Sequence, residues 1–298
     1  MSSVPDVRDR SHLGVRRRGS SPRQVGSLFA RLLGPLTVGT GKRESAPTSN
    51  REKQMLALLL LNLPHVTSTG LIIDELWTEN PPKTAMTTLQ TYILHLRKFL
   101  AETMGVSART VAKEYLVHRS GGYVFVASQV DLDVEEFRAL ERRAHMEVDL
   151  DDYQGAVRTA ESALSLWHGQ ALMDVQAGQY IQAEIHGLEQ ARLSLIEEKI
   201  EAEMVLGRDR KVLGELSTLV TRYPLHEGLN SSYIRALANS GYRTRALEVY
   251  QDLRAVMVDQ IGLEPSAELR ELHEAILTDR LPRARTERRR GELLRHPA

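Results

Sequence analysis

Two hydrophobic patterns divide the chain near residue 130. Before that point, short apolar runs alternate with turn residues between positions 28 and 47, which predicts short antiparallel strands. Apolar residues then recur at helical spacing and predict helices over 51–63, over 70–77, and from Lys83 or Thr84 to about Ala101. Two β-rich runs, 114–118 and 123–126, flank a Gly-Gly turn and predict a hairpin. Strands, three helices and a closing hairpin predict a winged helix-turn-helix.

After Val130 the pattern is helical throughout. It predicts helices near 133–146, 150–167, 179–206, 208–222, 226–239, 242–260 and 266–278. The motif Gly-Arg-(x3)-Val-Leu at 207–213 recurs 34 residues later as Gly-Tyr-(x3)-Ala-Leu at 241–247. Thirty-four residues is the tetratricopeptide period, so we expect stacked helix pairs, with a plain helical bundle as the alternative.

The two ends of the chain lack any period. Residues 1–26 are rich in Ser, Arg, Pro and Gly, and residues 280–290 are rich in Arg, so both read as disordered basic tails. The predicted division is a tail over 1–27, a winged helix-turn-helix over 28–128, a tetratricopeptide-like domain over 129–279 and a second tail over 280–298. The predicted fold class is therefore mainly α with a small α+β part.

The third predicted helix has two contrasting faces. On a helical wheel one side is a stripe expected to be buried, made of Ala85, Leu89, Ile93, Leu96 and Leu100. The opposite side carries Thr84, Thr87, Thr91, Leu94 and Lys98, flanked by Thr88, Gln90, His95 and Arg97. No Asp or Glu occurs between Lys83 and Ala101. An ordinary amphipathic surface helix would more often carry Glu–Lys pairs, so the acid-free face favours contact with DNA phosphates.

This face suits a helix that lies in a major groove. Thr and Gln side chains can bond to base edges, and the free N–H groups near Lys83 and Thr84 can hold a phosphate. Arg97 and Lys98 are placed to reach phosphates, while Leu94 could contact a thymine methyl group or a protein partner. Arg119 beside Gly121-Gly122 suits a wing laid on the DNA backbone. Arg51 and Lys53 are either phosphate contacts or solvated charges.

Composition adds exclusions and a charge asymmetry. The 298 residues include 39 Lys+Arg, 39 Asp+Glu and no Cys, so disulfides and thiolate chemistry are absent. The longest apolar run, 55–61, is too short to span a membrane, and we expect a soluble cytoplasmic protein. Residues 32–128 carry ten Lys/Arg against seven acids, whereas residues 129–279 carry 15 against 28. A basic front half could face a polyanion that repels the acidic back half.

Chemistry-bearing motifs give no support for catalysis. The ten His residues are scattered without a zinc-protease motif, and no nucleophile elbow is present. We therefore predict that the protein is not an enzyme and has no metal site and no cofactor.

Several short motifs resemble the SARP family, the antibiotic-regulatory-protein activators of actinobacterial secondary metabolism. The most specific is Thr-Thr-Leu-Gln-Thr-Tyr-Ile-(x2)-Leu-Arg at 87–97, which is similar to the recognition helix of that family. The others are Leu-Gly-Pro-Leu at 33–36, Asp-Glu-Leu-Trp at 74–77 with Pro81-Pro82, Gly-Gly-Tyr at 121–123, Leu-(x2)-Trp-(x)-Gly-(x)-Ala-Leu at 164–172 and Gly-Leu-Glu-Pro-Ser at 262–266. The last two resemble the bacterial transcriptional activation domain.

The resemblance implies a transcriptional activator of an antibiotic biosynthetic cluster, with a winged helix of the two-component output type. It implies that side-by-side protomers bind direct repeats in double-stranded promoter DNA and recruit RNA polymerase holoenzyme, including its sigma factor. The candidate base-reading residues are Thr87, Thr88, Gln90, Thr91 and His95. The candidate backbone contacts are Arg51, Lys53, Lys83, Thr84, Arg97, Lys98 and Arg119. Two alternatives stay open: a repressor that uses the same DNA domain, and a tetratricopeptide interaction scaffold. Nucleoid association follows if the protein is an activator or a repressor. None of the three functions involves a membrane.

Overall fold

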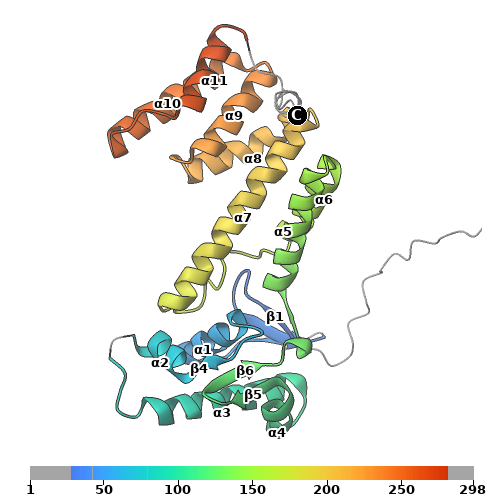
Figure 1. Ribbon diagram of the computed structural model, residues 1–298, viewed down its shortest axis with the longest axis vertical. Helices are drawn as coiled ribbons and strands as arrows, with labels where there is room; N and C mark the ends of the chain where they lie inside the picture. The colour runs from blue at the N-terminus through green and yellow to red at the C-terminus, as the bar shows by residue number, and fades with distance from the viewer. Residues whose placement is uncertain (1–27, 42, 79, 281–298) are drawn as a thin grey trace, which may run out of the picture.

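A computed structural model describes residues 28–41, 43–78 and 80–280 (Figure 1). The predicted tail over 1–27 lies outside the described residues, and so does all of the second tail except Arg280. The described part has a mixed α/β module at one end and an all-helical module, α8 to α11, at the other. The long helix α7 (Gln179–Val205) runs between them. The predicted fold class, mainly α with a small α+β part, is confirmed.

The first sheet of the mixed module joins segments far apart in the sequence. Its strands are β1 (Leu28–Arg31), β2 (Thr37–Thr40), β3 (Arg43–Ser45) and β7 (Val130–Leu132), in the order β3-β2-β1-β7. The first three strands are antiparallel, as predicted. Strand β7 was not predicted; it pairs in parallel with β1, with Leu28 opposite Val130. The start of the predicted second domain is therefore part of the first sheet.

Three helices and a hairpin complete the predicted winged helix-turn-helix. The helices are α1 (Asn50–Leu61), α2 (Thr69–Trp77) and α3 (Ala85–Met104). The second sheet contains β4 (Thr67–Ser68), β5 (Leu116–Arg119) and β6 (Gly122–Phe125) in the order β4-β6-β5. The side chain of Ser68 caps α2 by accepting from Leu71 N at 3.1 Å.

One predicted strand boundary is wrong. Glu114 and Tyr115, expected in a strand, belong to a π-helical turn, η1 (Val111–Tyr115), which follows the short helix α4 (Ala108–Thr110). Tyr115 is buried at 8 % exposure, so this turn anchors the base of the hairpin in the core. The 3₁₀ turn η2 (Ala127–Gln129) then leads from the hairpin into β7.

The rest of the described chain is helical, as the pattern predicted. Besides α7, the helices are α5 (Asp133–Asp149), α6 (Tyr153–Leu164), α8 (Asp209–Arg222), α9 (Glu227–Asn239), α10 (Arg243–Ile261) and α11 (Ala267–Leu277). Helices α8 and α10 begin 34 positions apart, at Asp209 and Arg243, which agrees with the predicted repeat. Val212 and its counterpart Ala246 are both buried.

The hydrophobic cores do not divide at the predicted domain boundary. One core begins at Leu28 and ends at Leu195, so the winged helix shares it with α5, α6 and the first part of α7. The second core begins at Leu193 and ends at Ile276, and it combines the remainder of α7 with α8 to α11. Helix α7 is therefore the element common to both cores. In the part of the chain that the structure describes, no helix combines the length and the apolar character needed to cross a membrane.

Candidate nucleic-acid interface

Helix α3 is clamped by the predicted apolar stripe. Ala85, Leu89, Ile93, Leu96 and Leu100 are all at most 7 % exposed, as expected from their spacing. Helix α3 packs against α1 and α2, and the Tyr92 ring stacks on Trp77 of α2 with 6.4 Å between ring centroids. Gly105, in a left-handed conformation at φ +69°, ends the helix. The opposite face is consequently held in one orientation.

The outward face of α3 carries the residue types predicted for it. Its exposed residues from the N-terminus are Met86, Thr87, Gln90, Thr91, Leu94, His95 and Lys98, preceded by exposed Lys83 and Thr84. Thr88 and Arg97 are half-buried at the edges. The first carboxylate on this helix is Glu102, in its last turn. In Figure 1, α3 lies at the end of the molecule remote from α10 and α11, so this face is not covered by the helical module.

Two candidate base-reading residues are oriented by hydrogen bonds. Thr91 Oγ1 donates to the Thr87 carbonyl at 3.0 Å, so Thr91 can present its methyl group and the hydroxyl lone pairs outward. His95 Nδ1 lies 2.8 Å from Glu52 Oε1 of α1. This contact fixes the ring and leaves Nε2 as its free edge. Sequence reasoning missed Glu52, whose carboxylate is paired with His95 at the edge of the face.

Arg97 joins α3 to the hairpin. Its Nε and Nη2 both donate to the Leu116 carbonyl of β5, at 3.2 and 2.9 Å, and its guanidinium lies 5.9 Å from the centroid of the Tyr123 ring. Burial lowers the pKa of Arg97, and the nearby Tyr123 partly opposes this change. Two of the five Arg97 N–H donors therefore serve the fold, whereas Lys98 beside it is exposed.

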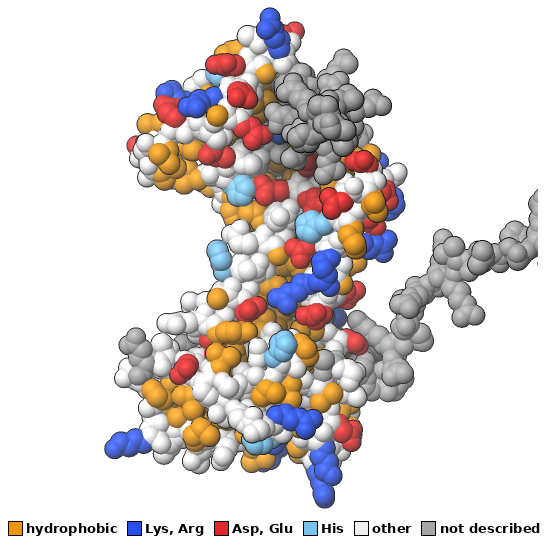
Figure 2. All heavy atoms as spheres, in the orientation of Figure 1, with side chains coloured by type: hydrophobic (Ala, Val, Ile, Leu, Met, Phe, Trp, Pro, Cys, Tyr) orange, Lys and Arg blue, Asp and Glu red, His pale blue; other side chains and the backbone are white. Residues whose placement is uncertain are grey.

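The hairpin of β5 and β6 forms the predicted wing. Arg119 pairs with Gly122 in the ladder, and Arg119, Ser120 and Gly121 are exposed at the tip. Gly121 has φ +83°, which an L side chain rarely adopts, and its carbonyl accepts from Thr69 N at 2.9 Å. The wing is thus bonded to the start of α2, and its hairpin lies at the same end of the molecule as α3 (Figure 1). In Figure 2, several Lys and Arg side chains project from that lower end, others lie higher up, and most of the carboxylates in view lie above it.

Two further candidate cations have partners inside the protein. Arg51 Nη1 donates to Gln54 Oε1 at 3.1 Å and to the Leu76 carbonyl at the end of α2. Lys53 Nζ lies 2.5 Å from Asp174 Oδ2, in the segment between α6 and α7. The Lys53 bond and the Leu36 N–H together hold the pKa of Asp174 below its usual value, although burial acts in the opposite direction. Both cations therefore have acceptors inside the protein, which favours a role in packing between elements over contact with phosphates.

A buried carboxylate joins the helix-turn-helix to α7. Glu75 of α2 is 3 % exposed and accepts from Gly178 N at 2.6 Å and from Tyr180 N at 2.9 Å, at the N-terminus of α7. Gln54 Nε2 contacts the same carboxylate at 3.4 Å. A negative charge is favoured at a helix N-terminus, where N–H groups lack helical partners. Sequence reasoning missed this contact because its partners lie about a hundred residues apart.

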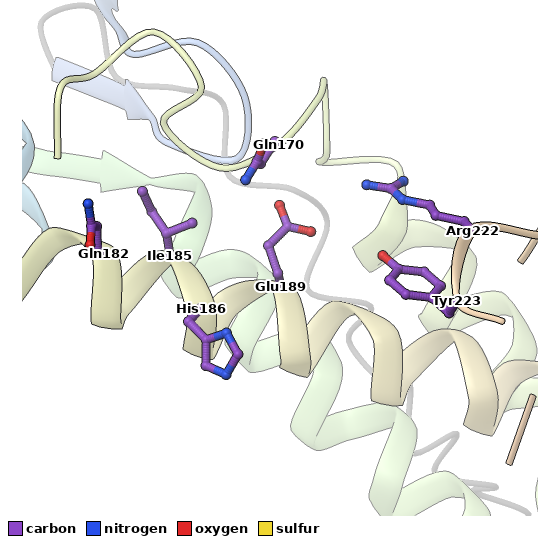
Figure 3. A pocket seen from close by; sticks show the side chains of 7 residues that line it. All are labelled: Gln170, Gln182, Ile185, His186, Glu189, Arg222 and Tyr223. Atoms are coloured by element: carbon purple, nitrogen blue, oxygen red, sulfur yellow. The ribbon is translucent and has the colours of Figure 1, made fainter. Parts of the chain in front are cut away.

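A hollow of about 410 Å³ lies along α7, between the 165–178 segment and the end of α8 (Figure 3). Its lining residues are Gln170, Gln182, Ile185, His186, Glu189, Arg222 and Tyr223. Glu189 points from α7 toward the segment that carries Gln170, and its Oε1 accepts from Ala171 N at 3.0 Å. Glu189 thus positions that segment. Among the described residues, no group of three or more His, Asp or Glu side chains is arranged to hold a metal ion.

Comparisons with known families divide the chain in two. Residues 43–125 match the family described as transcriptional regulatory protein, C terminal, and residues 132–277 match the family described as bacterial transcriptional activator domain. The first match spans the three helices and the wing. The second spans α5 to α11.

Individual relatives match across both parts. Regulatory protein DnrI of Streptomyces peucetius is 37% identical over 246 residues, which are 83% of this chain and 90% of DnrI. Regulatory protein AfsR of Streptomyces griseus is 31% identical over 88% of this chain, which spans 26% of AfsR. The solved structure of Mycobacterium tuberculosis EmbR, in complex with a low affinity phosphopeptide, has a TM-score of 0.79 and 26% identity, covering 90% of this chain and 69% of EmbR. These relatives are named as regulators rather than as enzymes.

Proposed function

Because the chain belongs to the SARP family of transcriptional activators, we propose that it activates an antibiotic biosynthetic cluster by binding direct repeats in the promoters of that cluster. Regulators of this family bind promoter DNA. The observation that carries the assignment to this molecule is the outward face of α3, which combines hydroxyl, amide and cationic groups and has no carboxylate before Glu102.

In the proposed complex, α3 enters the major groove. Thr87, Gln90, Thr91 and His95 face base edges, with Thr88 at the rim of the contact. Lys83, Thr84, Lys98 and Arg119 bind phosphates on either side, and the N-terminus of α3 adds the positive end of its helix dipole. The support for this orientation is that the apolar stripe fixes the helix and the Gly121 carbonyl fixes the wing beside it.

The helical module has a different role in the proposal. Residues 129–279, which include this module and the helices α5 to α7 before it, carry 28 acids against 15 Lys/Arg. A DNA duplex therefore repels this part of the chain. Repeats about one helical turn apart (roughly 10–10.5 base pairs) place two protomers side by side on one face of the duplex, in the manner of helix-turn-helix dimers. Each protomer then offers its helical module to RNA polymerase holoenzyme, including the sigma factor, and raises the local concentration of polymerase. Such a protein acts in the cytoplasm, on nucleoid DNA.

A salt titration tests the DNA face. The protein selects a duplex from a random library, and binding is measured by fluorescence anisotropy at several salt concentrations. Lys98→Ala removes one phosphate contact, so the slope of log affinity against log salt becomes shallower by about 0.9. Arg210→Ala, which removes an exposed cation on α8, is the matched control and leaves the slope unchanged. Equal slopes for the wild type and both variants would contradict the proposed orientation.

Base reading has a separate readout. Thr91→Ala lowers the discrimination between the selected duplex and single-base variants by about 1–3 kcal/mol at the contacted position.

In vitro transcription with and without the protein distinguishes activator from repressor, because an activator increases the amount of transcript and a repressor decreases it. Absent or salt-independent DNA binding would favour the interaction scaffold.

A further inference from the structure

Leu94 is an apolar residue at the centre of the outward face, whose other exposed apolar residue, Met86, lies at the flank. Leu94 is 49 % exposed, whereas the five residues of the apolar stripe on the same helix are at most 7 % exposed. At 100° per residue, Leu94 lies on the side of α3 away from that stripe, within about 60° of Thr87, Thr91 and Lys98. A leucine at such a position leaves apolar surface in water unless a ligand covers it.

Thr91 extends this apolar spot. Residues three apart are neighbours on a helix surface, so Thr91 lies one turn from Leu94. Because Thr91 Oγ1 donates its proton to the Thr87 carbonyl at 3.0 Å, the Thr91 methyl group remains available for contact beside the Leu94 side chain. The two groups form an apolar pair within the outward face, with Gln90 and His95 on either side of it.

From this arrangement, and resting on the proposed function, we propose that Leu94 together with the Thr91 methyl group recognises the 5-methyl group of a thymine. The centre of the outward face points at the floor of the groove, where the base edges lie. Among the four bases, only thymine presents an apolar group in the major groove. Lys98, four residues beyond Leu94, attracts phosphate. This charge favours DNA over an uncharged protein surface as the partner of the face. Leu94 is thus a specificity-determining residue for an A·T pair.

Replacing thymine with deoxyuridine tests the inference, because the two bases differ only by that methyl group. The probe is the duplex selected from a random library by the wild-type protein, with each thymine replaced in turn. At one position the wild type loses about fourfold in affinity, the factor for one buried methyl-sized group. Leu94→Ala binds the thymine and uracil duplexes equally at that position. Leu94→Ile, which keeps an apolar side chain, retains most of the difference.

Met86→Ala is the matched control. Met86 is 48 % exposed but lies at the flank of the same helix, so this variant keeps the uracil penalty at the position assigned to Leu94. Circular dichroism checks that each variant is folded, which is expected because both side chains are half exposed. The inference would be overturned if the wild type lost no affinity on replacement of any thymine by deoxyuridine. It would also be overturned if Leu94→Ala lost as much affinity as the wild type.

A third outcome identifies a different occupant. If Leu94→Ala changes self-association in sedimentation experiments and leaves the uracil effect intact, Leu94 contacts a second copy of the chain and the inference is wrong. If binding depends on salt but is equal for the thymine and deoxyuridine duplexes, this inference is refuted and the proposed function still stands. Failure to bind any duplex overturns both.

Discussion

Removal of the Glu75 carboxylate is expected to weaken the joint between the helix-turn-helix and α7. Glu75 is 3 % exposed and accepts two short bonds from the N-terminus of α7, at 2.6 and 2.9 Å. A hydrogen bond to a charged group contributes about 1.5–3 kcal/mol, and the helix dipole adds up to about 2 kcal/mol in a partly buried site. Desolvation of the carboxylate offsets part of this sum. We therefore expect Glu75→Ala to lower the free energy of unfolding by about 3 kcal/mol.

Urea unfolding followed by circular dichroism measures this loss. Asp74→Ala is the matched control, because Asp74 is the preceding residue of the same helix and is exposed; its change should stay within about 0.5 kcal/mol. Glu75→Gln keeps the shape and one acceptor oxygen, so its loss should lie between those of the two alanine variants. A loss below about 1 kcal/mol for Glu75→Ala, or an equal loss for Asp74→Ala, would refute the reasoning.

Two further predictions concern the acid response and the wing. Burial raises the pKa of Glu203, but hydrogen bonds from Lys211 and Arg208 outweigh it, and the folded-state pKa lies below the ordinary 4.5. The resulting stability is present above about pH 4.5 and is lost as the pH falls through the lower folded-state pKa, so urea midpoints should decline there less steeply in Glu203→Gln than in the wild type; equal slopes would count against this. Gly122→Ala would place a Cβ 2.1 Å from the Thr67 carbonyl oxygen and should cost about 1–3 kcal/mol by pushing β4 and β6 apart, whereas an unchanged melting temperature would show that this approach is not tight.

Local periodicity made α3 and the helical module predictable. Each residue of the apolar stripe is three or four positions from the next, so the buried face could be read without knowledge of the fold. The 34-residue repeat was visible for a similar reason, since it depends on spacing within the chain. Strand β7 has only three residues, and its partner β1 lies about a hundred residues earlier, so no local pattern marked it.

The roles of individual charges depended on distant partners. Lys53 and Asp174 are 121 positions apart, and Arg97 meets a backbone carbonyl of a strand that follows α3. Sequence alone placed Lys53, Arg51 and Arg97 among possible phosphate contacts, and only the three-dimensional packing gives them internal acceptors. Lys98 and Arg119 remain exposed, and their role on DNA stays a prediction.

The length of α7 has a mechanical consequence. Its 27 residues rise about 40 Å, from the Glu75 carboxylate in the first core to the middle of the second. A continuous helix anchored in this way acts as a strut that sets both the separation and the azimuth of the two modules. Adding one residue to its middle would lengthen it by only about 1.5 Å but rotate everything beyond by about 100°. The number of residues in α7 therefore sets the angle about the helix axis at which the second core stands relative to the winged helix.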